Sequence, residues 1–483
     1  MYWGDADLVH SYRVRGHPAS EGCRLSDLAG ATLIRKAINV RFSRSFAKVM
    51  SLMNPRALSG QVASTFITNV ALAALGMLTG VLAARLLGVQ GRGELAAIQS
   101  WAMFIASLAM LGVQDAIIYL GARDKEHDGS IALSATLLSV TAGTAFFACG
   151  WIAMPLLLKA QSAAVIQVSR WYLLFVFGNA LSGLPIFLLR ARQEVFKWNL
   201  LRLSSPLVWL AVLGFCYARD IRLSITVAEI QLGASLGLTL LMSLYGAKII
   251  GLSARPSLKY WAGLLRFGLP VFLSTLPQYL TLRVDQLLMA AFLPADILGV
   301  YVVAVAWAGA TDMVSAAIGA VLFPAVAALG HSSEQHRLIV KSLRLGLAAS
   351  LASSLVMGSL AVPLVPTLFG KGFSGAIPIS WVLLFAGVFT SYNNLAEQGL
   401  KGLGRTKAVL WAELLGLVVT IGALALLLMP LKAMGAALAS LIAYISVSTC
   451  LTILYAQITG VGAARFITEL VLMGRFGDRT VNQ

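Results

Sequence analysis

The chain has 483 residues, of which 58% are hydrophobic and only 12% are charged. Soluble globular proteins carry about twice that charged share, so a chain of several soluble domains is excluded. Apolar runs of roughly twenty residues or more recur along the sequence, and each is long enough to cross a hydrocarbon layer about 30 Å thick. Because these runs are continuous and do not alternate, they predict an all-α polytopic membrane protein and argue against a β-barrel.

We predict twelve transmembrane helices with short connectors between them. In chain order they lie near residues 62–86, 95–120, 131–158, 171–189, 199–218, 223–247, 267–293, 297–329, 342–368, 376–400, 408–429 and 433–457. Two sets of six spans keep the same orientation, which permits a parallel repeat about an axis along the membrane normal. A short sequence similarity between the halves supports the repeat, because Gly93 lies eight residues before Trp101 and Gly299 lies eight residues before Trp307.

The basic residues predict the orientation of the spans. Of the 37 Lys and Arg residues, 28 fall on the side of the two termini, eight fall on the other side, and one, Arg283, lies within a span. The positive-inside rule therefore places both termini in the cytoplasm. The net charge of +17 is an orientation signal and an attraction to anionic headgroups, and no soluble module is expected to bind nucleic acid.

The prediction divides the chain into four parts. They are a cytoplasmic N-terminal tail over 1–61, a first six-helix bundle over 62–250, a second bundle over 251–457 and a cytoplasmic C-terminal tail over 458–483. The tail segment RKAINVRFSRSFAKVM has Lys and Arg at helical intervals among apolar residues, as in helices that lie on a membrane surface. Met50 and Met53 stand shortly before the first span, so a start codon assigned too far upstream explains the tail equally well.

A charged pair stands inside the seventh span, in the sequence LTLRVDQLLM. Arg283 and Asp285 lie two residues apart, roughly 200° around a helix, so they do not readily neutralise each other. Each charge costs about 2.5–3.5 kcal/mol at a helix centre and needs a partner. Pro270 and Pro277 interrupt backbone bonding in the same span, and interrupted helices with charges mark transporter sites. We expect a water-filled cavity lined by both residues. In the alternative, Arg283 extends outward to the interface and Asp285 makes an interhelical hydrogen bond.

Further polar residues are predicted at depth in other spans. Asp312 lies near the middle of the eighth span, Asn69 in the first and Asn179 in the fourth. Asp312 joins Asp285 as a candidate for a coupling ion such as H⁺ or Na⁺, whereas Asn69 and Asn179 are candidates for substrate contact in the cavity. Glu397 and Glu413 fall nearer the cytoplasmic ends, where a structural role is as good an explanation.

Other kinds of site are not expected. No GxxxxGK[ST] motif occurs, so any uphill work must come from an ion or substrate gradient and not from a P-loop. The four cysteines are scattered without a CxxC pair, and the five histidines fall in the tail or in polar loops. Neither a metal site nor a cofactor is therefore predicted, and the short connectors hold no catalytic cluster.

Four segments of the chain resemble a known family. They are GVLAARLLGVQGRGELAAIQSW, RFGLPVFLSTLPQYLTLRVDQLLMAAFLPADILGVYVVA, VLFPAVAAL and EQGLKGLGRTKAVLWAELLGLVV. They are similar to segments of bacterial polysaccharide-biosynthesis flippases of the Wzx type, in the multidrug/oligosaccharidyl-lipid/polysaccharide (MOP) exporter superfamily. The resemblance covers roughly residues 56–457, and it identifies the superfamily better than the substrate.

This resemblance implies two six-helix bundles around a central cavity, worked by alternating access. It implies a polyprenyl-diphosphate-linked oligosaccharide as substrate, moved to the outer leaflet for O-antigen, capsule or exopolysaccharide synthesis. Membrane lipids and the polymerase and glycosyltransferases of the same pathway are the implied partners. Arg283 and Asp285 match the Arg and Asp of the family's seventh span, and Arg85 matches the Arg that closes its first span. A planar guanidinium suits a phosphate, which also offsets its burial.

Two other functions stay open at this point. A cation-coupled drug or cation antiporter of the same superfamily shares the twelve-span plan, although a net basic cavity favours an anionic lipid. From a different class, a membrane polysaccharide polymerase or glycosyltransferase would need a large outer loop with catalytic groups, and the outer connectors here are short.

Overall fold

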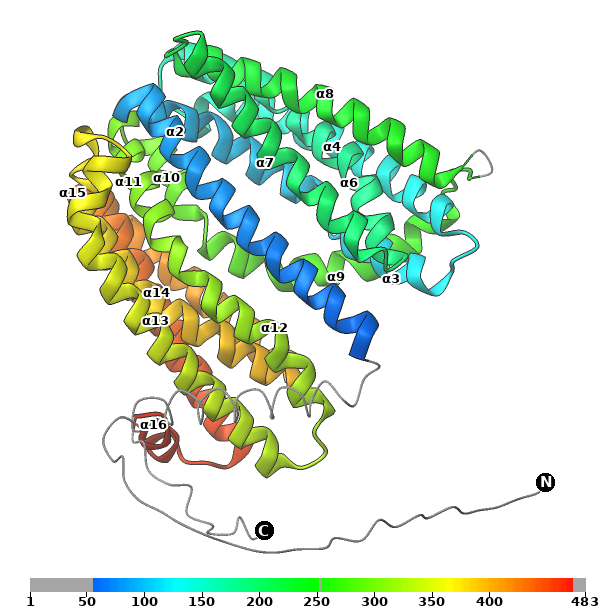
Figure 1. The fold of residues 1–483 in the computed structure, drawn as a ribbon, viewed down its shortest axis with the longest axis vertical. Helices are drawn as coiled ribbons and strands as arrows, with labels where there is room; N and C mark the ends of the chain where they lie inside the picture. Colours follow the sequence, from blue (N-terminus) through cyan, green and yellow to red (C-terminus); the bar gives the residue numbers. More distant parts are fainter. Residues whose placement is uncertain (1–54, 252–253, 472–483) are drawn as a thin grey trace, which may run out of the picture. The chain divides into compact units, whose positions relative to one another are not determined.

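Hydrocarbon offers the backbone no hydrogen-bond partner, so apolar spans are expected to be helical. The computed structural model describes residues 55–251 and 254–471, and every regular element in that part of the chain is a helix (Figure 1). Residues 63–483 group into one unit, apart from residues 1–62. The predicted N-terminal tail therefore lies almost wholly outside the described residues.

The helices follow the predicted spans closely. In chain order they are α2 (Pro55–Ala109), α3 (Val113–Arg123), α4 (Asp128–Leu157), α5 (Ala163–Tyr172), α6 (Phe175–Ala191), α7 (Val195–Ala218), α8 (Ser224–Ile250), α9 (Lys259–Thr281), α10 (Val284–Phe292), α11 (Ala295–Ala308), η1 (Gly309–Thr311), α12 (Asp312–Ala328), α13 (Ser332–Leu368), η2 (Lys371–Phe373), α14 (Ala376–Gly402), α15 (Thr406–Thr459) and α16 (Ala463–Val471). Within the described residues, eight helical segments are long and apolar enough to cross a membrane, or nine if the bent pair α11 and α12 is one span. The polytopic helical class is confirmed, while twelve spans in two bundles of six stay a prediction.

Two of the helices are far longer than one span needs. Helix α2 has 55 residues and α15 has 54, against about 20 for a single crossing. Each contains one residue with non-helical backbone angles, Gly88 with φ 67° and Lys432 with φ 52°. Both residues lie between two predicted spans, so each long helix is a pair of helices joined at a sharp kink.

Two other predicted spans are broken into shorter helices. The span over 267–293 becomes α9 and α10, which are separated at Leu282 and Arg283, and the span over 297–329 becomes α11, η1 and α12 with a bend of 49°. Prolines were expected to cause the first break. Helix α9 instead continues through Pro270 and Pro277 and ends at Thr281.

In the described part of the chain, two helices each pack against four others. Helix α6 packs against α3, α4, α7 and α8, and α14 packs against α11, α12, α13 and α15. Helix α9 contacts both sets, because it lies against α3 and α4 and also against α15 (Figure 1). The helix that leads to the charged break is therefore held by elements from both halves of the sequence.

Helices α2 and α11 approach each other most closely at Gly93 and Gly299. A Cβ atom on Gly93 would lie 1.6 Å from the carbonyl oxygen of Ala295, and one on Gly299 would lie 2.1 Å from the carbonyl oxygen of Val89. Ala295 precedes Gly299 by four residues, as Val89 precedes Gly93, so the contact is the same when seen from either helix. Such reciprocity is what a twofold repeat produces, and only glycine leaves room for it.

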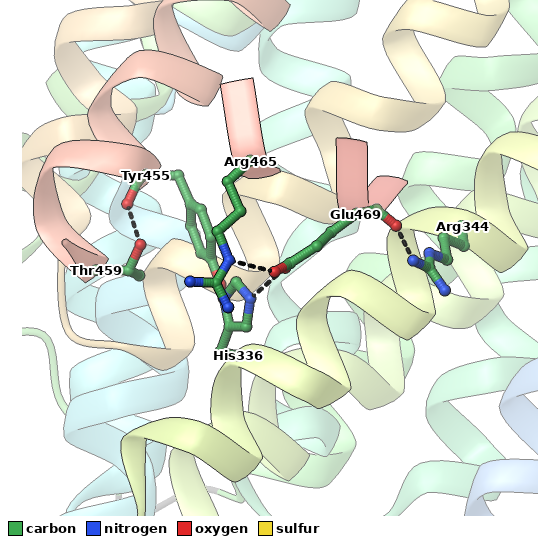
Figure 2. Close-up of polar contacts among 6 residues, drawn as sticks. All are labelled: His336, Arg344, Tyr455, Thr459, Arg465 and Glu469. Atoms are coloured by element: carbon green, nitrogen blue, oxygen red, sulfur yellow. Dashed lines mark hydrogen bonds and ion pairs between the residues drawn. The ribbon is translucent and has the colours of Figure 1, made fainter. Parts of the chain in front are cut away.

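The C-terminal helix α16 is anchored by one ring and one carboxylate. Phe466 is 1% exposed, and Glu469 lies 2.9 Å from Nε2 of His336 and 3.0 Å from Nε of Arg465 (Figure 2). Arg344 also donates to the backbone carbonyl of Glu469. Partial burial works to raise the pKa of Glu469, but the hydrogen bonds from His336 and Arg465 outweigh it and hold that pKa below its usual value. Helix α16 thus joins the start of α13 to the end of α15.

The close contact of α2 with α11 predicts that Gly93→Ala destabilises the protein. The added methyl group would collide with backbone atoms, and overpacking of this kind costs about 1–3 kcal/mol or more. Heating the purified protein in detergent and measuring the monodisperse fraction that remains should show a lower midpoint than in the wild type. The matched control is Gly80→Ala on the same helix, where no heavy atom lies within 4 Å of the added carbon. A wild-type midpoint for Gly93→Ala would show that the two helices are not in close contact there.

Candidate functional site

The break between α9 and α10 is the feature around which the candidate site is built. Arg283 occupies the position before α10 with non-helical backbone angles, φ −133° and ψ −22°. Tyr279, four residues earlier, stacks on Phe104 of α2 with ring centroids 6.1 Å apart and an interplanar angle of 4°. The break therefore lies beside α2, at the meeting of the two halves of the sequence.

Arg283 is exposed, and its guanidinium makes no hydrogen bond or ion pair with any described residue. It follows Leu282, which is 44% exposed, so the break presents a free guanidinium at a surface of the described helices. An arginine within an apolar span carries a high cost unless water or an anion reaches it. This side chain is therefore available to a ligand.

Asp285 is placed quite differently from Arg283. Its carboxylate is 6% exposed and accepts hydrogen bonds from the hydroxyl of Tyr301 and from the backbone N–H of Gln286 at 2.6 Å. Tyr301 lies on α11, so this bond ties α10 to the next helix. Asp285 thus makes the interhelical hydrogen bond of the alternative prediction while Arg283 stays exposed, and a cavity lined by both residues is not confirmed.

Asp312 stands at the second break, as the first residue of α12 after η1. Its carboxylate makes no hydrogen bond or ion pair with any described residue, while its carbonyl oxygen accepts from the hydroxyl of Ser315 at 3.0 Å. Both interrupted spans therefore carry an unpaired charged residue at the interruption, a cation at the first and an anion at the second. Ends of broken helices in membranes are places where ions and polar ligands bind.

The other residues predicted to contact substrate do not gather around Arg283. Arg85 donates to the carbonyl oxygen of Leu368 at 2.7 Å and to that of Thr367, so it satisfies the last carbonyl groups of α13. Asn69 accepts a hydrogen bond from Arg202 at 2.9 Å. Asn179 is half-buried on α6 and has no hydrogen bond within the described part of the chain. Arg85 and Asn69 thus have partners elsewhere, whereas Asp285 and Asp312 both lie within electrostatic range of Tyr444 on α15.

A buried acidic pair was not among the predicted site residues. Glu397 on α14 and Glu413 on α15 are 2% and 6% exposed and lie beside each other. Glu397 accepts hydrogen bonds from Lys401 at 3.0 Å and from Gln278 of α9 at 3.4 Å. One lysine faces two carboxyl groups, so a proton or a metal cation would balance the cluster. The sequence places both near helix ends and does not show that packing between helices buries them.

The sequence matches one family model over more than half of its length. The model describes polysaccharide biosynthesis proteins, and the match covers residues 59–329. Among curated proteins none matches the chain.

Several solved structures share the fold. An inward-facing multidrug resistance transporter of the MATE family and MOP superfamily has a TM-score of 0.64 at 17% identity, with 83% of this chain and 99% of that one covered. The lipid II flippase MurJ in an inward closed conformation has a TM-score of 0.66 at 13% identity, with 84% and 90% covered. A MOP-superfamily transporter from Pyrococcus furiosus, described as having a binding pocket of reversed polarity, scores 0.56 at 16% identity, with 84% and 95% covered. The predicted superfamily fold is thereby confirmed.

The Asp285–Tyr301 bond predicts that Tyr301→Phe lowers stability. Loss of the hydroxyl removes a donor from a buried carboxylate, and hydrogen bonds to charged groups contribute about 1.5–3 kcal/mol. The thermal midpoint of the purified protein should fall in Tyr301→Phe and partly recover in the double variant Asp285→Asn/Tyr301→Phe, which carries no buried charge. Equal midpoints for the wild type and Tyr301→Phe would contradict this role of the bond.

Proposed function

Because the chain belongs to the polysaccharide biosynthesis protein family and has the MOP-superfamily fold, we propose that it is a flippase for lipid-linked oligosaccharides. Its substrate is a repeat unit carried on a polyprenyl diphosphate, moved from the cytoplasmic to the outer leaflet of the plasma membrane. A lipid II flippase is among the proteins that share the fold, which supports a lipid-linked substrate. The protein is a transporter in this proposal and not an enzyme.

The observation that carries the proposal is the free guanidinium of Arg283 at the break between α9 and α10. A diphosphate is a compact anion whose oxygens match the planar donors of arginine, often through two parallel hydrogen bonds. Binding of the diphosphate would offset the cost of holding this charge within an apolar span. A neutral or cationic substrate would leave the solvation of this charge to water alone.

Alternating access requires contacts that close one side and can be broken. Three contacts join distant parts of the chain at the predicted outer ends of the helices. The glycine contact joins α2 to α11, and Arg85 joins α2 to the carbonyl groups at the end of α13. Gly372, in η2, also lies against Val89, with 3.0 Å between a Cβ atom on the glycine and the valine side chain. These contacts fit a state that is closed toward the outside, and opening to that side would separate them.

In this proposal, an ion gradient is coupled to transport through acidic residues whose carboxylates are not fully paired with cations. The carboxylate of Asp312 is unpaired among the described residues. Glu397 and Glu413 have only one lysine, Lys401, to balance their two carboxyl groups. A proton or Na⁺ would bind at either place in exchange with transport. Asp285 is the third candidate, although an ion would compete there with the hydroxyl of Tyr301.

The wider setting follows from the substrate. Glycosyltransferases would build the repeat unit at the cytoplasmic face, and a polymerase would consume it at the outer face. Both termini of the chain would lie in the cytoplasm, where the basic residues gather.

Arg283→Gln should lower transport about ten- to a hundredfold, since the loss of charged hydrogen bonds costs about 1.5–3 kcal/mol. Arg283→Lys keeps the charge without the planar fork, so its loss should be smaller. The measurement is the accumulation of lipid-linked repeat units in the cytoplasmic leaflet of cells that carry each variant as their only copy. Arg266→Gln is the matched control, because Arg266 is an exposed arginine on α9, the helix that precedes the break. Normal transport by Arg283→Gln, with export of organic cations instead, would favour the antiporter.

Asp312→Asn and Glu413→Gln test the coupling sites separately. The variant that removes the coupling carboxyl group should still transport down a substrate gradient but no longer respond to an imposed pH or Na⁺ gradient in proteoliposomes. Glu334→Gln, an exposed acid in the first turn of α13, should respond as the wild type does. Full gradient dependence in both variants, and in Asp285→Asn, would remove these acids from the coupling mechanism.

A further inference from the structure

Two arginines share one indole ring on the predicted cytoplasmic side of α6 and α7. Arg190 lies in the last turn of α6, and Arg202 lies seven residues after the start of α7. Their guanidinium carbons stand 5.1 Å and 4.6 Å from the centre of the Trp198 ring. Stacking on an aromatic ring orients a guanidinium without consuming its N–H donors.

Neither arginine is paired with an acid in the described part of the chain. Arg202 donates to the side-chain oxygen of Asn69 at 2.9 Å and to that of Asn199 at 3.3 Å, and both acceptors are neutral. Arg190 is exposed, and its contact within the described residues is the stacking on Trp198. Two positive charges therefore stand together with neutral partners only.

The neighbouring basic residues show that acids are available in this region. Arg192 pairs with Asp128 at 2.6 Å, and Lys197 pairs with Glu194 at 2.5 Å. Both pairs lie within a few residues of Arg190 and Trp198. The charges of the two stacked arginines are thus not neutralised by an acid, whereas those of the adjacent Arg192 and Lys197 are.

The amides around Arg202 add further donors. Asn199 is 2% exposed, and its Nδ2 donates to Ser64 at 3.2 Å and to Thr65 at 3.1 Å, which fixes the orientation of its oxygen toward Arg202. Asn69 is exposed, and its Nδ2 donates to no described residue. Free donors from Arg190, Arg202 and Asn69 therefore outnumber the free acceptors, as at a binding site for an anion.

We propose that Arg190, Arg202, Trp198 and Asn69 bind the phosphate of a lipid headgroup at the inner membrane surface, between α2 and α7. Arg202 lies three residues, about 5 Å, inside the predicted span that starts at residue 199, so its long side chain reaches back to the headgroup region. The chemistry fits a phosphate from either of two sources, the diphosphate of a polyprenyl lipid or an anionic phospholipid. The first source rests on the proposed function, and it would make this site the place where substrate waits before it reaches Arg283.

The test is equilibrium binding to the full-length protein in phosphatidylcholine nanodiscs, with two probes used separately. These are radiolabelled undecaprenyl diphosphate without sugar, and phosphatidylglycerol as the added anionic phospholipid. The double variant Arg190→Gln/Arg202→Gln should lose at least tenfold in affinity for the probe that the site takes. The matched control is Arg219→Gln/Arg222→Gln at the opposite end of α7, which removes the same charge and should bind as the wild type does.

A tenfold loss for undecaprenyl diphosphate supports a substrate dock, and a loss confined to phosphatidylglycerol supports a phospholipid site. Unchanged affinity for both probes overturns the proposal. Should the double variant elute as an aggregate, Trp198→Leu keeps both charges and should weaken the same probe, and unchanged binding there overturns it too. Binding is measured without transport, so failure here is distinct from failure of the flippase proposal, which the Arg283 variants decide.

Discussion

The constraint on which this structure depends is that hydrocarbon can neither hydrogen-bond a backbone nor solvate a charge. Long stretches of unbroken helix meet the first demand, and they account for most of the described chain. Departures from helix then become informative, since each leaves polar groups that something else must satisfy. The interruptions at Leu282–Arg283 and at η1 are such departures, and both carry a charged residue that no described side chain neutralises.

Hydrophobic pattern was sufficient to predict the helices but not the way in which they break. The two predicted spans on either side of Gly88 form one long helix with a kink, and so do the two on either side of Lys432. The length of an apolar run predicts each span, but it does not show whether a loop or a kink joins one span to the next. In the seventh span the prolines led us to expect the break at the wrong place. A proline inside an apolar helix costs one hydrogen bond, which α9 tolerates at both Pro270 and Pro277 before it ends two residues ahead of Arg283.

The candidate site was predictable in part for the same reason. Charges within apolar runs are rare, so Arg283, Asp285 and Asp312 were visible in the sequence alone. Their partners were not, because the bond from Tyr301 to Asp285 and the bond from Arg85 to the end of α13 depend on packing between distant segments. Glu397 and Glu413 lie near helix ends, but their burial depends on contacts among α9, α14 and α15 that the sequence does not show.

The reciprocal glycine contact also allows the charged breaks of the second half, at Arg283 and Asp312, to be compared with the equivalent positions of the first half. Gly93 and Gly299 differ by 206 positions, as Trp101 and Trp307 do. The same offset pairs Gly88, the kink of α2, with Pro294, which precedes α11, so both halves turn at the same place.

Applied to the site, this offset pairs Arg283 with Met77 and Asp285 with Thr79. Thr79 bonds to carbonyl groups of its own helix, at 2.8 Å to Leu75, and α2 is unbroken there. Asp312 pairs with Ala106, which is 1% exposed within the continuous second part of α2. A repeat that began with two equivalent halves would thus have kept one copy as an intact apolar helix while the other acquired breaks and charges. The two helix breaks that carry Arg283 and Asp312 then belong to the second half, and their counterparts in the first half lie within continuous helix.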